Sequence, residues 1–172
     1  KVAPALAAGC TMLVKPALET PLTAIAIAEL AIQAGIPEGV LSIVTGDGEA
    51  IGKIFSESAV VRKLSFTGST RVGRLLMASS ASTIKRLSLE LGGNAPFIVC
   101  ETADVERAVQ GAIQSKFRNA GQTCVCANAF YVHANVYDEF TAKFIARVNQ
   151  LMLGNGKNES VDIGPLINEN AL

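Results

Sequence analysis

The chain has 172 residues, of which 49% are hydrophobic and 17% charged, and its 15 basic residues balance its 15 acidic ones. This balance provides no basic stripe for a nucleic acid, and no apolar run approaches the length of a bilayer span, so we expect neither nucleic acid nor membrane as a partner. Four cysteines in a chain this rich in core-type residues predict a reducing compartment rather than a disulfide scaffold, and the single histidine, His133, argues against a metal site. A composition this apolar means either thorough burial or a surface that meets protein outside this chain.

Short β-type runs alternate with helical stretches throughout the chain. Thr20 is expected to cap the first long helix, with Pro21 at its first position and Gly35 closing it. Asn135 is expected to cap the last helix and Gly154 to end it. This alternation predicts an α/β fold with a mostly parallel sheet that is covered on both faces. The expected strands are residues 11–14, 41–44, 64–67, 87–90, 96–99 and 130–132, and the expected helices begin near Thr20, Gly48, Ser69, Asp104 and Asn135.

The Gly92–Gly93 pair marks the expected boundary between two domains, residues 1–91 and 92–172. The chain opens inside an Ala/Leu-rich helical run and stops without a capping signal, so we expect both ends to be cuts through a larger protein. The alternative is a small complete domain with ragged ends.

Two strand ends in residues 1–91 carry side chains suited to a nucleotide. In Ser65–Thr70 a strand ends at Gly68 and hydroxyl residues open a helix, an arrangement that favours a pyrophosphate. Lys15, followed by Pro16, ends another strand and can reach a ribose hydroxyl or a phosphate. The simpler alternatives are an ordinary capped helix and a solvated lysine before a turn proline, and the spacing from Gly68 to Gly73 is not the usual dinucleotide pattern.

A carboxylate and a thiol are the candidates for acid–base and nucleophilic chemistry. Glu90 ends an apolar strand, and apolar surroundings would suit a general base; the alternative is an exposed strand-end glutamate. Cys124 lies in the loop segment Gly121–Cys126, where an accessible cysteine can act as a nucleophile. The alternative is a buried small side chain, the description that Cys10 and Cys100 fit because they lie within apolar runs.

Taken together, five segments resemble aldehyde dehydrogenases in order and spacing, and the resemblance extends over essentially the whole chain. Glu-Leu-Gly-Gly from Glu90 and Gly-Gln-x-Cys ending at Cys124 are similar to the two active-site signatures of that family. The resemblance implies a Rossmann-like NAD(P)-binding domain in residues 1–91 and the first part of a catalytic α/β domain in residues 92–172. The segments are Thr11–Pro21, Phe66–Gly73, Leu89–Pro96, Phe117–Cys126 and Gly164–Ile167.

The resemblance also implies a role for each matched residue. Cys124 would be the thiolate that attacks the aldehyde carbon, with its own N–H as an oxyanion donor, and Glu90 the base that activates water against the thioester. The Asn that completes the oxyanion hole and the Glu that holds the nicotinamide ribose are expected outside this chain, so the chain alone is expected to be inactive. The residues expected to bind NAD or NADP are Lys15, Pro16, Ala17, Leu18, Gly68, Ser69, Gly73 and Leu91.

Within the family, Asn94–Val99 and Ser115–Cys126 look most like succinate-semialdehyde dehydrogenases, which implies the oxidation of that aldehyde in GABA degradation. Arg118 corresponds to an arginine that binds the substrate carboxylate; the alternative is that it caps the end of its own helix. Rival interpretations are the oxidation of glutarate semialdehyde or of an uncharged aldehyde, and a non-catalytic nucleotide-binding module. The full-length protein is expected to be a homo-oligomer in the cytoplasm, or in the mitochondrial matrix of a eukaryote.

Two local features bear on cofactor choice and on redox behaviour. Members of the family that favour NAD commonly carry a glutamate three residues after the lysine, but here Leu18 takes that place. Glu19 would point to the opposite side of an extended segment, so we expect NADP to be accepted at least as well as NAD. Cys124 and Cys126 are one residue apart, which suggests a strained and reversible oxidised pair.

Overall fold

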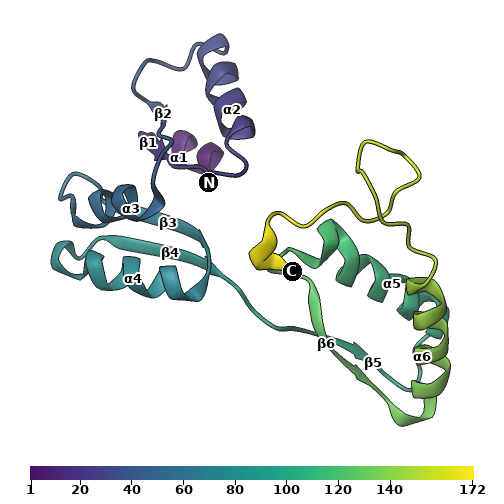
Figure 1. Ribbon diagram of the computed structural model, residues 1–172. Helices are drawn as coiled ribbons and strands as arrows, with labels where there is room; N and C mark the ends of the chain where they lie inside the picture. Colours follow the sequence, from purple (N-terminus) through teal and green to yellow (C-terminus); the bar gives the residue numbers. More distant parts are fainter. The chain divides into compact units, whose positions relative to one another are not determined.

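A computed structural model describes residues 1–172, and the chain divides into two compact units, Lys1–Leu91 (unit 1) and Gly92–Leu172 (unit 2) (Figure 1). Neighbouring strands run parallel in both units, as the alternation of strands and helices predicted. The strands pair two by two, so three two-stranded sheets take the place of the continuous sheet that the sequence led us to expect. No helix has the length and hydropathy needed to cross a membrane.

Unit 1 contains two of the parallel pairs, β1 with β2 and β3 with β4. Helix α4 packs against both strands of the second pair, and α3 packs against α4. The elements are α1 (Val2–Ala7), β1 (Met12–Val14), α2 (Leu22–Gln33), β2 (Leu41–Ile43), α3 (Gly48–Glu57), β3 (Lys63–Gly68), α4 (Thr70–Ser80) and β4 (Arg86–Leu91).

Helix α2 is capped differently from the expectation. Pro21, not Thr20, is the N-cap residue. No side chain caps the helix, because the proline side chain has no hydrogen-bonding group, although its ring holds φ at a helical value. The end of α2 is as predicted. Gly35 has a φ of 81°, and the N–H groups of Gly35 and Ile36 donate to carbonyls of the last turn over 2.9 and 3.0 Å, the bond pattern of a Schellman motif.

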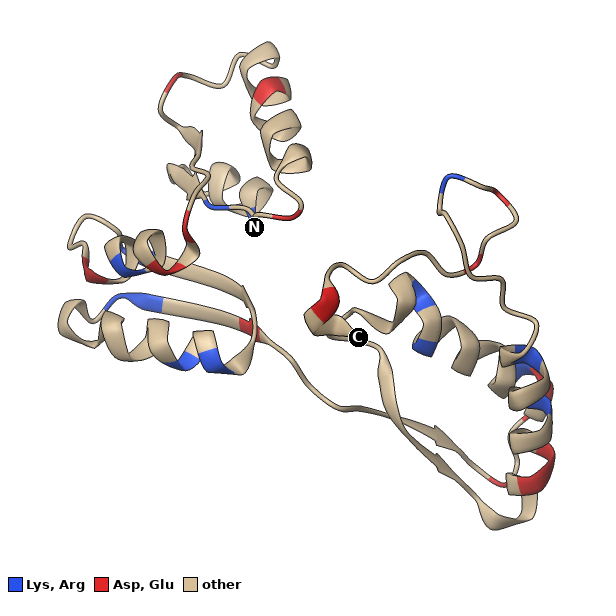
Figure 2. Cartoon of the chain, viewed as in Figure 1, with Lys and Arg blue, Asp and Glu red and all other residues tan.

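Helix α2 is mostly apolar, and its apolar residues are distributed around the helix. Glu29 is its only charged residue (Figure 2). Its large apolar side chains are nevertheless exposed, with Leu22 at 77% and Ile32 at 68%. A helix with this composition is typical of a protein interior, so the described chain leaves its apolar surface uncovered.

Lys85 connects the end of α3 with the segment that enters β3. Its ammonium group donates hydrogen bonds to the carbonyl oxygens of Phe55, Ser58 and Val61 over 2.8, 2.8 and 3.1 Å. A cation here satisfies carbonyls that the end of a helix leaves without partners. Desolvation lowers the pKa of Lys85 from its ordinary value.

In unit 2, two helices pack on one strand pair (Figure 1). Strand alternation turns Phe97 and Val99 towards the helices, whereas Ile98 and Tyr131 are 68% and 61% exposed. This sheet is therefore covered on one face and not on both, which corrects the expectation. The elements are β5 (Ala95–Val99), α5 (Val105–Phe117), β6 (Ala127–Val132) and α6 (Ala134–Val148), and the buried core consists of Val99, Val105, Val109, Ala112 and Phe140.

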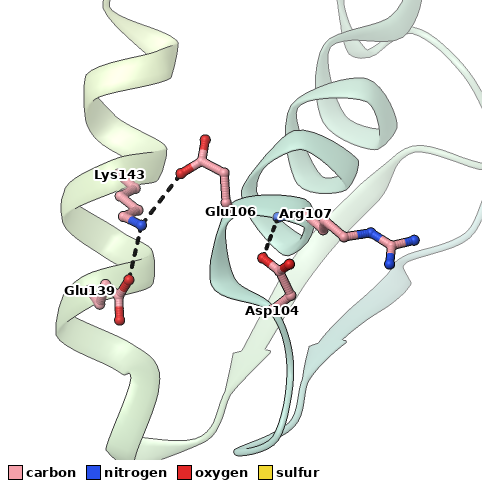
Figure 3. Close-up of polar contacts among 5 residues, drawn as sticks. All are labelled: Asp104, Glu106, Arg107, Glu139 and Lys143. Atoms are coloured by element: carbon pink, nitrogen blue, oxygen red, sulfur yellow. Dashed lines mark hydrogen bonds and ion pairs between the residues drawn. The ribbon is translucent and has the colours of Figure 1, made fainter.

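Aromatic packing and one ion-pair cluster join α5, α6 and the sheet. Phe144 lies 5.4 Å from Phe130 and 5.7 Å from Phe140, measured between ring centroids. Lys143 of α6 bridges Glu139 at 2.9 Å and Glu106 of α5 at 3.4 Å (Figure 3). The hydrogen bond to Glu139, and to a smaller extent the one to Glu106, raises the pKa of Lys143 above its ordinary value. Because these ion pairs are exposed, the apolar core contributes most of the stability of this packing.

Helix α6 differs from the expectation at both ends. His133 is the N-cap, and its Nδ1 accepts the N–H of Asn135 over 3.3 Å, while the Asn135 side chain donates to Glu101 instead. The helix ends at Val148 and not at Gly154. The helix does not reach Gly154 because Met152 pairs with Asp162. The N–H of Met152 donates to the Asp162 carboxylate, and the N–H of Asp162 donates to the Met152 carbonyl.

Replacing Lys85 with methionine is expected to lower the free energy of unfolding by about 1.5–3 kcal/mol, because three carbonyls lose a charged donor. Urea denaturation measures the change. Lys53→Met, at an exposed position on α3, is the matched control and is expected to change stability by less than about 0.5 kcal/mol. Equal effects of the two substitutions would contradict the capping role of Lys85.

Candidate active site

Cys124 lies on an exposed turn between α5 and β6. The N–H of Cys126 donates to the carbonyl of Thr123 over 3.3 Å, which places Cys124 and Val125 at the two central positions of the turn. Both residues are exposed, and neither backbone N–H has an acceptor. The turn therefore presents a thiol together with two free N–H donors, the groups that a nucleophile and an oxyanion require.

The backbone before this turn has an unusual conformation. Asn119, Ala120 and Gly121 all have positive φ angles, of 52°, 56° and 77°. Only glycine adopts this region without a steric penalty, so neighbouring contacts must stabilise the other two residues. The side chain of Gln122 contributes two such contacts, as a donor to Asn119 and as an acceptor from Ile167.

Cys126 anchors the other side of the turn. Its side chain is 1% exposed, its Sγ lies 2.8 Å from the Thr123 hydroxyl, and it donates to the Arg118 carbonyl over 3.7 Å. All four cysteines are free. An oxidised pair with Cys124 would need Cys126 to leave its buried position. Sequence reasoning gave neither Gln122 nor Cys126 a positional role, although both lie inside the matched segment Phe117–Cys126.

The other two cysteines were wrongly expected to be buried. Cys10 and Cys100 are exposed in the described chain. Cys10 follows α1 and Cys100 follows β5, so each lies just beyond the element whose apolar residues suggested burial. Of the four thiols, only Cys126 behaves as a buried small side chain.

Arg118 directly follows α5, at its C-cap position, and its side chain is exposed. Its guanidinium group donates no hydrogen bond and lies in no ion pair, since Lys143 makes the only ion pairs of the chain. The alternative that this guanidinium caps its own helix is therefore not realised. Arg118 and the Cys124 turn are close neighbours, because the Arg118 carbonyl accepts from Cys126.

Glu90 lies near the end of β4, in register with Thr67 of β3. Its side chain is exposed in the described chain. The apolar surroundings expected for it are not formed by unit 1, because strand alternation places Glu90 on the open side of β4 while Leu89 and Leu91 are partly buried. The carboxylate makes no hydrogen bond and no ion pair within the chain.

The carboxyl end of β3 and the start of α4 form the candidate phosphate site. Ser69 caps α4 by accepting the N–H of Val72 over 3.3 Å, which leaves the N–H groups of Thr70 and Arg71 without acceptors. Gly68 is exposed, and a Cβ there would lie 2.5 Å from the ring of Phe66. A side chain at this position would have to displace the Phe66 ring. The free N–H groups at the start of α4 fit an anionic group.

Gly73 and Leu91 lie together on the other side of α4. Gly73 is buried, and a Cβ there would approach the Leu91 side chain to 2.7 Å. Packing between α4 and β4 thus explains this glycine. A cofactor could touch Gly73 only if that packing opened, whereas Leu91 is partly exposed at the end of its strand.

Lys15 follows β1 and extends to the start of α3. Its Nζ is 3.5 Å from the place of a Cβ on Gly48, the first residue of α3, and no carboxylate pairs with it. An ammonium group beside the positive end of a helix dipole favours a negatively charged ligand, so Lys15 fits a phosphate-bearing cofactor.

The residues after Lys15 correct one premise about cofactor choice. The N–H of Thr20 donates to the carbonyl of Ala17 over 3.4 Å, so Leu18 and Glu19 occupy a turn and not an extended segment. Strict alternation of side chains therefore does not apply to them. Both side chains are exposed, with Leu18 at 60%, while Pro16 is partly buried.

The candidate residues thus fall into separate local groups. Cys124 and Arg118 lie together in unit 2, whereas Lys15, the Gly68–Ser69 strand end and Glu90 belong to unit 1. No cluster of three or more His, Cys, Asp or Glu side chains could hold a metal ion.

The parallel strand pairs and the helices that pack on them form an α/β fold, and solved aldehyde dehydrogenases share this fold. A succinate-semialdehyde dehydrogenase from Burkholderia pseudomallei superposes with a TM-score of 0.97 at 61% identity, over 99% of this chain and 36% of that one. The aldehyde dehydrogenase family model matches residues 1–172, and the chain belongs to this family.

Curated relatives agree with this assignment. The chain is 58% identical over its whole length to the NADP(+) succinate-semialdehyde dehydrogenase of Escherichia coli (strain K12) and 58% identical to a glutarate-semialdehyde dehydrogenase of Pseudomonas putida. In each case it spans 36% of the relative's length, about a third of the protein.

Proposed function

We propose that this chain supplies the nucleophile and part of the cofactor site of an NAD(P)-dependent dehydrogenase that oxidises succinate semialdehyde to succinate. The observation that carries the proposal is the exposed Cys124 turn, whose thiol and two free N–H groups belong to consecutive residues. Membership of the aldehyde dehydrogenase family supports the reaction class.

The chemistry assigned to this chain begins at the thiol. The Cys124 thiolate adds to the aldehyde carbon, and the N–H donors of the turn stabilise the negative charge that develops on the carbonyl oxygen. A bound nicotinamide supplies the acceptor for the hydride that leaves this carbon, which turns the adduct into a thioester. Glu90 then takes a proton from the water that attacks the thioester, and the acid departs as Cys124 regains its thiolate.

The free guanidinium of Arg118 supports a substrate that carries a carboxylate. The Arg118 backbone contacts the nucleophile turn through Cys126, and its guanidinium has no partner in the chain. A guanidinium can bind a carboxylate through two parallel charge-assisted hydrogen bonds. The names of the two curated relatives specify succinate and glutarate semialdehyde, both of which have a carboxylate at the far end from the aldehyde. Succinate semialdehyde is our proposal, with glutarate semialdehyde as the alternative.

For the cofactor we propose NADP, accepted at least as well as NAD. The support is the unpaired Lys15 ammonium near the start of α3, with Leu18 in place of an acid three residues later. The name of the Escherichia coli relative specifies NADP(+). We further propose that the full-length protein is a homo-oligomer of the cytoplasm.

Glu90→Gln in the full-length protein is expected to block thioester hydrolysis more than hydride transfer. Rapid-mixing kinetics should then give a burst of reduced cofactor close to one per site, followed by little steady turnover. Cys124→Ala is the matched control and should abolish both burst and turnover, because no adduct forms. Steady turnover by Glu90→Gln without a burst would show that another group is the base.

Arg118→Ala is expected to lower kcat/KM for succinate semialdehyde by about one to two decades and to leave butanal nearly unchanged. Loss of a charge-assisted contact with a carboxylate costs about 1.5–3 kcal/mol. Arg107→Ala, at an exposed position on α5, controls for loss of charge and should affect neither substrate. Equal losses for both aldehydes in Arg118→Ala would assign this residue a structural role.

Leu18→Glu is expected to shift the ratio of kcat/KM values towards NAD, because a carboxylate near Lys15 repels a 2′-phosphate and accepts hydrogen bonds from ribose hydroxyls. Steady-state kinetics with both cofactors measure the ratio, and Leu18→Gln is the uncharged control. If the unmodified protein already prefers NAD by about a hundredfold, which is about 2.7 kcal/mol, Glu19 or a residue outside this chain makes the choice.

A further inference from the structure

Gln122, two residues before the nucleophile, has no part in the chemistry above but connects two distant segments. Its side-chain Nε2 donates to the carbonyl of Asn119 over 3.1 Å, and its Oε1 accepts the N–H of Ile167 over 2.9 Å. One amide therefore uses both its donor and its acceptor on backbone groups.

Gln122 and Asn119 are also joined through their backbones. The N–H of Gln122 donates to the Asn119 carbonyl over 3.1 Å, and the Asn119 side chain donates to the Gln122 carbonyl over 3.3 Å. These bonds enclose Ala120 and Gly121. Because Asn119 and Ala120 have left-handed backbone conformations that disfavour side chains, the enclosing bonds are what keeps the segment in this shape.

We propose that Gln122 is a positioning residue for the nucleophile turn. By holding Asn119 from one side and Ile167 from the other, it fixes where the turn starts and so where the Cys124 N–H lies relative to the substrate oxygen. A donor that must meet a developing oxyanion tolerates little displacement, and misplacement by about 1 Å can cost about a hundredfold in rate. This inference rests on the proposed function.

The two hydrogen bonds of the Gln122 side chain, to Asn119 and from Ile167, predict which replacements fail. Glutamate keeps the shape of glutamine and can still accept from Ile167, but it has no donor for the Asn119 carbonyl. Methionine has a similar length and offers neither. Gln150→Glu is the matched control, because the exposed Gln150 in the same unit accepts only a bond from Arg147.

The test uses the full-length protein and its Gln122→Glu, Gln122→Met and Gln150→Glu variants. We expect both Gln122 variants to lower kcat for aldehyde oxidation by about ten- to a hundredfold, with KM for the cofactor within about twofold of the original. Alkylation of Cys124 by iodoacetamide needs no oxyanion donor, so its rate in Gln122→Met should stay within about threefold. Gln150→Glu should match the unmodified protein throughout.

Two outcomes would overturn the proposal. One is a kcat within about twofold of the original for both Gln122 variants, which would mean that the turn keeps its position without the hydrogen bonds of the Gln122 side chain. The other is a loss of kcat that accompanies an equal loss of cofactor affinity and a lowered Tm, which would mean general structural damage. An unmodified protein that oxidises no aldehyde would instead refute the function on which the inference rests.

Discussion

Three successive residues with positive φ turn the chain from the end of α5 towards β6, and the exposure of Cys124 depends on this reversal. Without it, the chain would continue away from the sheet, and the turn that exposes Cys124 and Val125 would have no fixed starting point. The conformation is unfavourable for Asn119 and Ala120, so it persists only where surrounding bonds outweigh the strain. Strain of this kind is typical of sites at which a backbone must adopt one particular shape.

The rest of unit 2 supplies the rigid frame for this reversal. Helix α5 is fixed on the strand pair by its buried face and by α6, so the point from which the chain turns is itself fixed. The two flanks of the loop are also tied to each other. Ser115 accepts the N–H of Ala127 over 3.3 Å, and Lys116 donates to Asn128 over 2.9 Å. Because hydrogen bonds tie the two flanks of the loop together and Cys126 is buried, the loop can hold the exposed Cys124 thiol in a fixed position.

Unit 1 contributes strand ends rather than a packed site. Lys15 follows β1 and Gly68 ends β3, so each lies at the carboxyl end of a strand in a parallel pair. The carboxyl ends of parallel strands are where α/β folds bind nucleotides. Much of the apolar surface nearby is uncovered, including the large apolar side chains of α2. The chain spans about a third of the relatives that it matches, so of the two explanations for its apolar composition, incomplete coverage agrees better with the structure.

Much of this could be predicted from local patterns in the sequence. Alternation of strands and helices predicted parallel pairing, Gly35 predicted the end of α2, and Asp104 and Ser69 were recognisable as the residues that begin their helices. These features depend on contacts within a few residues, which is why a linear pattern contains them. The signature segments likewise identified the family, because the chemistry needs particular residues at particular positions.

Contacts between distant residues could not be predicted in this way. The chain after α6 is held by a hydrogen bond between Met152 and Asp162, which lie ten residues apart. The hydrogen bonds of the Gln122 side chain include one from Ile167, which lies 45 residues away. Burial was equally hidden: Cys126 is enclosed and Cys100 exposed, although both adjoin apolar strand residues. The sequence by itself determined the elements, the family and the candidate chemical groups, because these are local or family-specific. Only the tertiary structure decided which thiol is accessible and what holds its turn, because accessibility and long-range hydrogen bonds exist only once the chain has packed.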